Sequence, residues 1–165
     1  MSTLPHIPVI RRGRSYDSLD KINVADHKSG AVVAEVSTIN AGIIRKDLQK
    51  IGESRDALRK FSVQQLLEIS AKAGELFLNG TLPLGDRGHT QSPQQYVETL
   101  SRTSGLPWVM VRRNMGKIHH ALTHMKTVLN GLTRGLDLGI LDTGFGEQFG
   151  TKISYFPTKI GRAHV

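Results

Sequence analysis

The sequence contains no cysteine and few aromatic residues. Without cysteine, the 165 residues cannot form disulfides, thiolate metal sites or a cysteine nucleophile. Aromatic residues make up 5% of the chain, so aliphatic and methionine side chains must fill any interior. The chain also lacks a run of about 18 apolar residues, the length that a membrane-spanning helix needs, and its first ten residues do not resemble a signal peptide. We therefore expect a cytoplasmic protein without a membrane partner.

Positive charge is in surplus. The 22 Lys and Arg residues exceed the 14 Asp and Glu residues, which gives a formal net charge of +8. Such a balance is typical of proteins that meet nucleic acids or anionic surfaces. The basic residues are scattered, however, apart from small clusters near Arg11 and Arg112, and no interleaved aromatic residues or known binding motif accompany them. We therefore expect no nucleic acid partner.

The last six residues, 160–165, match the translation of a common sequencing adapter, ATC GGA AGA GCA CAC GTC. Residues of that origin do not belong in fold reasoning, and without Arg162 the net charge becomes +7 (8 − 1). The match predicts that the DNA read ended here, so that the chain is a fragment. We divide the remainder into an irregular N-terminal arm, 1–20, and a partial domain of a hairpin plus helices, 21–159.

The segment after the arm predicts a β-hairpin. Ile22 and Val24 alternate with polar residues, a turn follows at 27–30, and a second strand is expected over 31–36. Residues 81–91 are rich in Gly, Pro and Asp and predict a loop, whereas 151–156 predicts a further strand.

Helix start and stop signals predict three helices between the hairpin and residue 105. Asn40 is expected to cap the first helix, which carries Ile44, Leu48, Ile51 and later Leu58 at helical spacing. Ser62 with Gln65, and Ser92 followed by Pro93 at the first helical position, begin the next two. Glycines after Asn79 and Ser104 are expected to end them.

The last predicted helix has the longest apolar pattern in the chain. It starts after Pro107 and is expected to end at Asn130 and Gly131. Its apolar residues recur in steps of four and three, which predicts one continuous apolar stripe. That stripe consists of Val111, Met115, Ile118, Leu122, Met125 and Leu129.

Three patterns suggest chemistry, and each has a simpler interpretation. The glycine-rich segment 144–150 lacks the spacing and the following helix of a dinucleotide-binding loop, so we expect a surface loop. His120 and His124 have the spacing of two metal ligands but no third ligand nearby, and we interpret them as polar residues beside the apolar stripe. The carboxylate pairs Asp17/Asp20 and Asp137/Asp142 lie in loops without any context for acid–base work.

Several short sequence motifs occur in the same order as in a known protein family. Residues 14–18 read Arg-Ser-Tyr-Asp-Ser after a glycine, 26–36 read Asp-His-Lys-Ser-Gly-Ala-Val-Val-Ala-Glu-Val, and 100–107 read Leu-Ser-Arg-Thr-Ser-Gly-Leu-Pro. With the helical segment 57–73, these phrases resemble the N-terminal region of the aldehyde dehydrogenase superfamily. The corresponding family phrases are Gly-x-x-Tyr-x-Ser, Asp-Pro-x-Thr-Gly-x-x-Ile-Ala-x-Val and Glu-Thr-Gly-Lys-Pro. Here His27, Ser29 and Leu106 replace the family's Pro, Thr and Lys.

The resemblance implies an α/β fold class, namely the mostly helical N-terminal part of an aldehyde dehydrogenase-like fold, incomplete and with a β-hairpin. The implied parent protein is a homo-oligomer that oxidises an aldehyde to a carboxylic acid with NAD or NADP. In that family a cysteine thiolate attacks the aldehyde, hydride passes to the cofactor and a glutamate activates the water that releases the acid. These residues, and the Asn and Lys that bind the cofactor, would lie beyond residue 159.

We therefore assign no catalytic, cofactor-binding or metal residue within the chain and expect it to be inactive by itself. Two alternatives remain at this point. The parent could be an acyl-CoA reductase of the same superfamily, with an acyl-CoA substrate. The chain could instead be a small basic helical protein that binds an acidic partner or serves as a scaffold.

Overall fold

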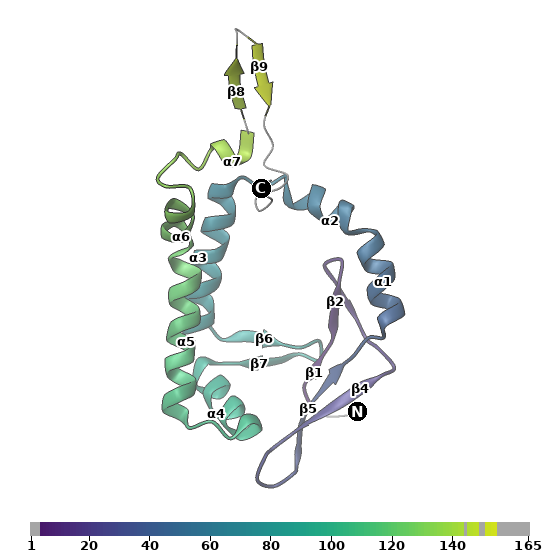
Figure 1. Cartoon of the computed structure of the whole chain (residues 1–165). Coiled ribbons are helices and arrows are strands. Elements are labelled where there is room, and N and C mark those ends of the chain that lie inside the picture. Colours follow the sequence, from purple (N-terminus) through teal and green to yellow (C-terminus); the bar gives the residue numbers. More distant parts are fainter. Residues whose placement is uncertain (1–3, 144, 149–150, 155–165) are drawn as a thin grey trace, which may run out of the picture.

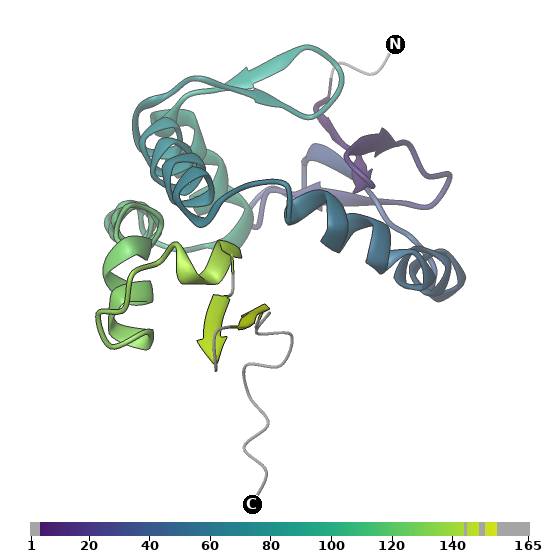
Figure 2. The same cartoon turned by 90° about the horizontal axis from the view of Figure 1, so that it is seen from above.

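The computed structural model describes residues 4–143, 145–148 and 151–154. Within them the chain is mixed α/β, with several small sheets and a series of helices. The chain is arranged as an open ring (Figure 1). One side consists of the helices that include α3, α5 and α6, and the other consists of the N-terminal strands with α1 and α2. A strand hairpin connects the two sides, and a second hairpin projects from the end of the helical side (Figures 1 and 2).

The predicted hairpin is present but belongs to a larger sheet. Strands β4 (Lys21–Ala25) and β5 (Val32–Ser37) are antiparallel, and β1 (His6–Ile7) pairs with β5 in parallel to give the order β1-β5-β4. Strands β2 (Val9–Arg11) and β3 (Arg14–Tyr16) form a separate hairpin. The prediction of an irregular arm over residues 1–20 was therefore wrong for these strands. They are too short to show an alternating pattern, and β1 gains its partner only through a long-range pairing.

Two of the next three helices begin at the predicted capping residues, whereas the single helix predicted from Asn40 to Leu58 is divided in two at Lys50. The Asn40 side chain accepts the Ile43 backbone N–H at the start of α1 (Ala41–Gln49), and α2 (Ile51–Leu58) follows directly. Ser62 and Gln65 form a reciprocal capping box at the start of α3 (Val63–Asn79), which Gly80 ends. These caps satisfy backbone N–H groups that the first turn of a helix leaves unpaired.

A second prediction that was wrong concerns residues 81–91. They contain the hairpin β6 (Leu82–Leu84) and β7 (His89–Gln91), in which Pro83 occupies a strand of a two-stranded ribbon. Proline is tolerated there because an edge position needs no N–H donor. The helix after it, α4 (Pro93–Ser104), has the predicted capping box at Ser92 and ends at Gly105 with a positive φ of 77°.

The long helix predicted from Pro107 to Asn130 and Gly131 is divided into α5 (Trp108–Thr123) and α6 (Met125–Leu132). At the break, both the backbone N–H and the ring Nδ1 of His124 bind the carbonyl of His120. Thr123 Oγ1 donates to the carbonyl of His119. Such side-chain bonds compete with the regular helical pattern and locally distort it.

The predicted apolar stripe is only partly buried. Val111 and Met115 are in the core, whereas Ile118 and Met125 are exposed. Helix α7 (Ile140–Thr143) and the antiparallel strands β8 (Phe145–Gln148) and β9 (Thr151–Ser154) follow. The expected strand over 151–156 is confirmed for the four residues of β9; residues 155 and 156 lie outside the described part of the chain. The expected loop over 144–150 was wrong for β8, because these residues pair with β9.

The core lies between α3, α4 and α5. Val97, Val111 and Met115 are the buried hydrophobic residues among those described, and partly buried side chains pack around them. The Phe77 ring meets the Tyr96 ring edge to face, with centroids 5.3 Å apart. Helices α3 and α5 approach closely at Gly74, where an added Cβ would lie 3.1 Å from the Leu122 Cβ. Among the described residues, no helix is long and apolar enough to span a membrane.

Candidate functional site

The clearest polar cluster lies where β1 meets β5 and the β6–β7 hairpin. The His6 side chain is 1% exposed. Its Nδ1 donates to the Asp86 carboxylate, with distances of 2.9 and 3.0 Å to the two oxygens. Its Nε2 is hydrogen-bonded to the Ser37 hydroxyl at 2.9 Å. Because a carboxylate can only accept, Nδ1 carries a proton, and both nitrogens of the buried ring have a polar partner.

These three residues have the distances of a Ser–His–carboxylate relay, which in hydrolases activates a serine nucleophile. Ser37 is 5% exposed, however, and its Oγ also accepts the Ser18 backbone N–H at 3.1 Å. A nucleophile needs access to a substrate carbonyl and donors around the developing oxyanion. The enclosed hydroxyl has neither, so we interpret the cluster as a structural clamp between the N-terminus and the hairpin.

The tip of the β6–β7 hairpin approaches this clamp so closely that it requires glycine. Gly85 has φ 69°, and a Cβ at that position would lie 1.8 Å from the carbonyl oxygen of His6. That carbonyl accepts the Asp86 backbone N–H at 3.2 Å. The Arg87 guanidinium binds the carbonyl of Leu4 at 3.2 Å and the Glu35 carboxylate at 2.8 Å. We call these contacts, together with the His6 cluster, the β1 clamp.

A second junction connects the β4–β5 turn with the end of α4. The backbone N–H and the ring Nδ1 of His27 both donate to the Arg102 carbonyl at 2.8 Å. The Arg102 Nε donates to the Asp26 carboxylate at 2.8 Å, and the His27 ring lies against Gly105. The Arg102 guanidinium, with help from the backbone N–H groups of Lys28 and Ser29, holds the pKa of Asp26 well below its ordinary range. We call this junction the Asp26 joint.

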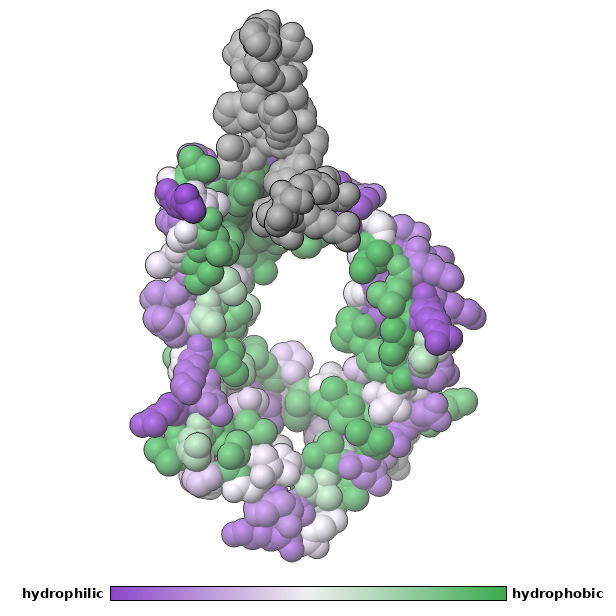
Figure 3. Space-filling model, in the orientation of Figure 1, coloured by the Kyte–Doolittle hydropathy of each residue, from purple (hydrophilic) through white to green (hydrophobic). Residues whose placement is uncertain are grey.

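Large apolar side chains remain exposed on both sides of the ring. In α1 and α2, Ile44, Leu48 and Ile51 recur at intervals of four and three and share one face, yet all three are exposed, as is Leu58. Neither helix has a buried residue. Figure 3 shows apolar surface along the inner edges of the opening on both sides. Exposed apolar surface of this extent is typical of a face that packs against further protein.

A cavity of about 470 Å³ lies where α2 leads into α3. Leu58, Phe61 and Leu66 line it, together with Leu141 of α7. The Asp142 carboxylate accepts the Val63 backbone N–H at 2.7 Å, which joins α7 to the start of α3. Arg59 and Asp142 also line this cavity, and the Asp142 carboxylate is engaged by the Val63 N–H.

The structure also places the residues that the sequence singled out. The His120 and His124 rings stack with centroids 3.8 Å apart, and the described part of the chain contains no group of three or more potential metal ligands. Asp17 pairs with Lys21 at 2.9 Å and lies 3.4 Å from the His6 Nε2. Asp137 accepts the Gly139 backbone N–H, and Asp142 accepts the Val63 backbone N–H at the start of α3.

Sequence reasoning missed both junctions. The Ser, His and Asp residues of the β1 clamp lie up to 80 residues apart, and no local pattern relates them. The one usable signal was Gly85, a glycine before Asp86 in a segment with other turn residues. The strained close approach that it permits appears only in the folded chain.

No family model matches this chain, and no curated protein and no solved structure matches it either.

Proposed function

We propose that this chain forms the N-terminal part of an NAD(P)-dependent aldehyde dehydrogenase-like oxidoreductase, which converts an aldehyde to a carboxylic acid. In this proposal the chain supplies a structural unit, and the residues that carry the chemistry belong to polypeptide outside it. The NAD or NADP site, the aldehyde site and the homo-oligomer interface are then properties of the parent enzyme. The aldehyde dehydrogenase-like fold of this region is part of the same proposal.

The observation that carries the proposal is a contact between two of the family-like phrases. The phrase at 26–36 forms the β4–β5 hairpin, and the phrase at 100–107 forms the end of α4 with Gly105 as its left-handed cap. Although about 75 residues separate them, they meet at the Asp26 joint through His27, Arg102 and Gly105. Two loose matches that pack against each other support a common origin better than the same matches do separately.

The exposed apolar faces support the proposal that this chain is a structural unit of a larger enzyme. A domain of this length that stood alone would bury much more than Val97, Val111 and Met115 in its core. The α1–α2 face and the inner edges of the opening fit a unit that packs against a further part of the same enzyme (Figure 3). A scaffold protein that binds an acidic partner would instead present polar, basic surface at this place.

The proposal is tested by extending the coding sequence in the source DNA beyond codon 159 and expressing the product. We expect a downstream domain with a nucleophilic cysteine and a glutamate, and aldehyde-dependent formation of NADH or NADPH measured at 340 nm. Replacing that cysteine by serine should abolish the signal. Activity only with an acyl-CoA substrate would favour the reductase alternative, and a stop codon directly after codon 159 would overturn the enzyme assignment.

The 165-residue chain provides the complementary measurement. Because it contributes no catalytic or cofactor residue in this proposal, calorimetric titration with NAD should give no binding heat. Tight binding of NAD by this chain alone would contradict the assignment of the cofactor site to another part of the enzyme.

A further inference from the structure

The turn of the β2–β3 hairpin concentrates positive charge on one face. Arg11 and Arg14 are direct partners across the antiparallel ladder, so their side chains leave the same face of the hairpin. The two residues between them, Arg12 and Gly13, have φ angles of 52° and 77°, which is the geometry of a tight two-residue turn. Like charges directly opposite each other destabilise a strand pair unless a counter-charge is present.

Two of the three guanidinium groups have a counter-charge within the protein. Arg11 binds both oxygens of Asp47 at 2.7 and 2.8 Å and lies 4.9 Å from the centroid of the Tyr16 ring. This contact holds the pKa of Asp47 below its ordinary range. Arg12 forms an ion pair with Glu53 of α2. Among the described residues, Arg14 is exposed and has no carboxylate partner.

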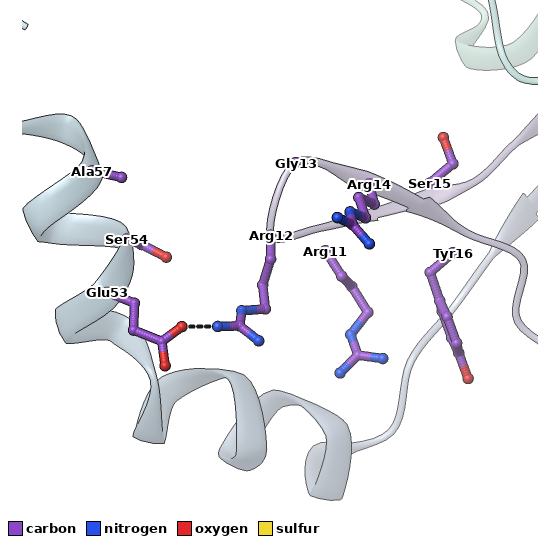
Figure 4. A pocket seen from close by; sticks show the side chains of 9 residues that line it. All are labelled: Arg11, Arg12, Gly13, Arg14, Ser15, Tyr16, Glu53, Ser54 and Ala57. Atoms are coloured by element: carbon purple, nitrogen blue, oxygen red, sulfur yellow. Dashed lines mark hydrogen bonds and ion pairs between the residues drawn. The ribbon is translucent and has the colours of Figure 1, made fainter.

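A cavity of about 790 Å³ separates the hairpin turn from α2. Figure 4 shows Ser54 and Ala57 of α2 directed toward the hairpin, and their small side chains leave the space open. The lining contains three guanidinium groups and one carboxylate, that of Glu53. Since Asp47 pairs with Arg11 and Glu53 with Arg12, Arg14 remains the uncompensated cation of the lining among the described residues and attracts an anion. The cavity volume is that of a site for a small organic molecule.

We propose that this cavity binds the phosphoryl group of a small phosphorylated molecule. Arg14 donates hydrogen bonds to the phosphoryl oxygens from its guanidinium group. Arg12 donates further bonds after it is partly released from Glu53, and the Ser54 hydroxyl adds a neutral donor. A phosphoryl group is favoured over a carboxylate because its dianion and three oxygens can engage two guanidinium groups at once. Arg11, already bound to Asp47, is a positioning residue that keeps the turn in place. The site is independent of the proposed oxidoreductase activity.

The test is calorimetric titration of the 165-residue chain with inorganic phosphate, glycerol 3-phosphate and acetate. We expect the two phosphates to bind and acetate to bind at least tenfold more weakly. Replacing Arg14 by glutamine should weaken phosphate binding by about tenfold, as expected for the loss of a charge-assisted hydrogen bond. Glu53→Gln should tighten it by about threefold, because the competing carboxylate is gone. Glycerol 3-phosphate binding more tightly than inorganic phosphate identifies an ester as the ligand, and equal affinity identifies the free ion.

The matched control is Arg113→Gln, which removes the same charge from an exposed position of α5. It should leave phosphate binding unchanged, and circular dichroism should show that all three variants retain their helices. The proposal is overturned if Arg113→Gln weakens binding as much as Arg14→Gln, since binding would then reflect net charge alone. It is equally overturned if acetate binds as tightly as phosphate, or if no phosphate binds at 10 mM.

Discussion

Both sides of the ring contain helices with an apolar face, but only one side buries that face within the described residues. Helices α3 and α5 pack against each other at Gly74 and share a core with α4 around Val111. Helices α1 and α2 have an equally regular apolar face, with Ile44, Leu48 and Ile51 at helical spacing, but bury none of it. An apolar stripe therefore indicates that a helix needs a partner, and it does not indicate whether the partner lies within the same chain. The predictions below test this contrast, from the largest effect to the smallest.

The strongest test compares two methionines of α5. Met115 is 4% exposed and Met110 is 51% exposed. Replacing Met115 by alanine should lower the free energy of unfolding by about 2–4 kcal/mol, because it removes buried contacts and leaves a cavity. The same change at Met110 should cost less than about 0.5 kcal/mol. Urea denaturation followed by circular dichroism measures both. Equal losses would mean that the α3–α5 core is not organised as described.

The next test concerns the β1 clamp, which connects the sheet side to the β6–β7 hairpin. Asp86→Ala leaves the buried Nδ1 of His6 without an acceptor, and we expect a loss of about 1–3 kcal/mol. The control is Asp56→Ala in α2, which removes an exposed carboxylate paired with Arg55. That change should cost less than about 0.5 kcal/mol. Hydrogen exchange should show faster exchange of β1 and β5 in the first variant, and unchanged protection of β1 would argue against the clamp.

Removing a helix cap should have a smaller effect on stability, and the effect should differ between the two sides of the ring. Ser62 caps α3, and Asn40 caps α1 through equivalent side-chain bonds. Either change to alanine should cost about 1 kcal/mol of local helix stability. For Ser62 the loss should appear in global unfolding, because α3 belongs to the core. For Asn40 it should appear only as faster hydrogen exchange within α1. A global loss from Asn40→Ala would show that α1 is coupled to the core.

The Asp26 joint predicts a modest dependence of stability on acid. Arg102 lowers the pKa of Asp26 in the folded chain, so the contact stabilises the fold above the ordinary carboxyl pKa of about 4. Its contribution should disappear as the pH falls below that value toward the lowered pKa. The thermal midpoint, measured from pH 7 to pH 2, should therefore fall less steeply in Asp26→Asn than in the unaltered chain. Asp137→Asn, at a carboxylate that accepts the backbone N–H of Gly139, provides the control, and an equal change there would refute the assignment.

Local features of the sequence were sufficient to predict part of the fold. Asn40, Ser62 and Ser92 each begin a helix, and Gly80 and Gly105 each end one, because caps depend on residues within one turn of each other. The β4–β5 hairpin was predictable for the same reason, since its alternation and its turn at Gly30 are adjacent in the chain.

What the sequence alone determined was therefore the type and most of the boundaries of the elements whose signals are local. Only the tertiary structure decided the partners: β1 beside β5, His6 between Ser37 and Asp86, and Arg102 on Asp26. It also decided which apolar faces are buried, and that Arg14 faces a cavity while Arg11 is neutralised by Asp47. The physical reason is sequence distance. Such contacts join residues that are 30 to 80 positions apart, and no pattern within a single element records which of several exposed faces will meet.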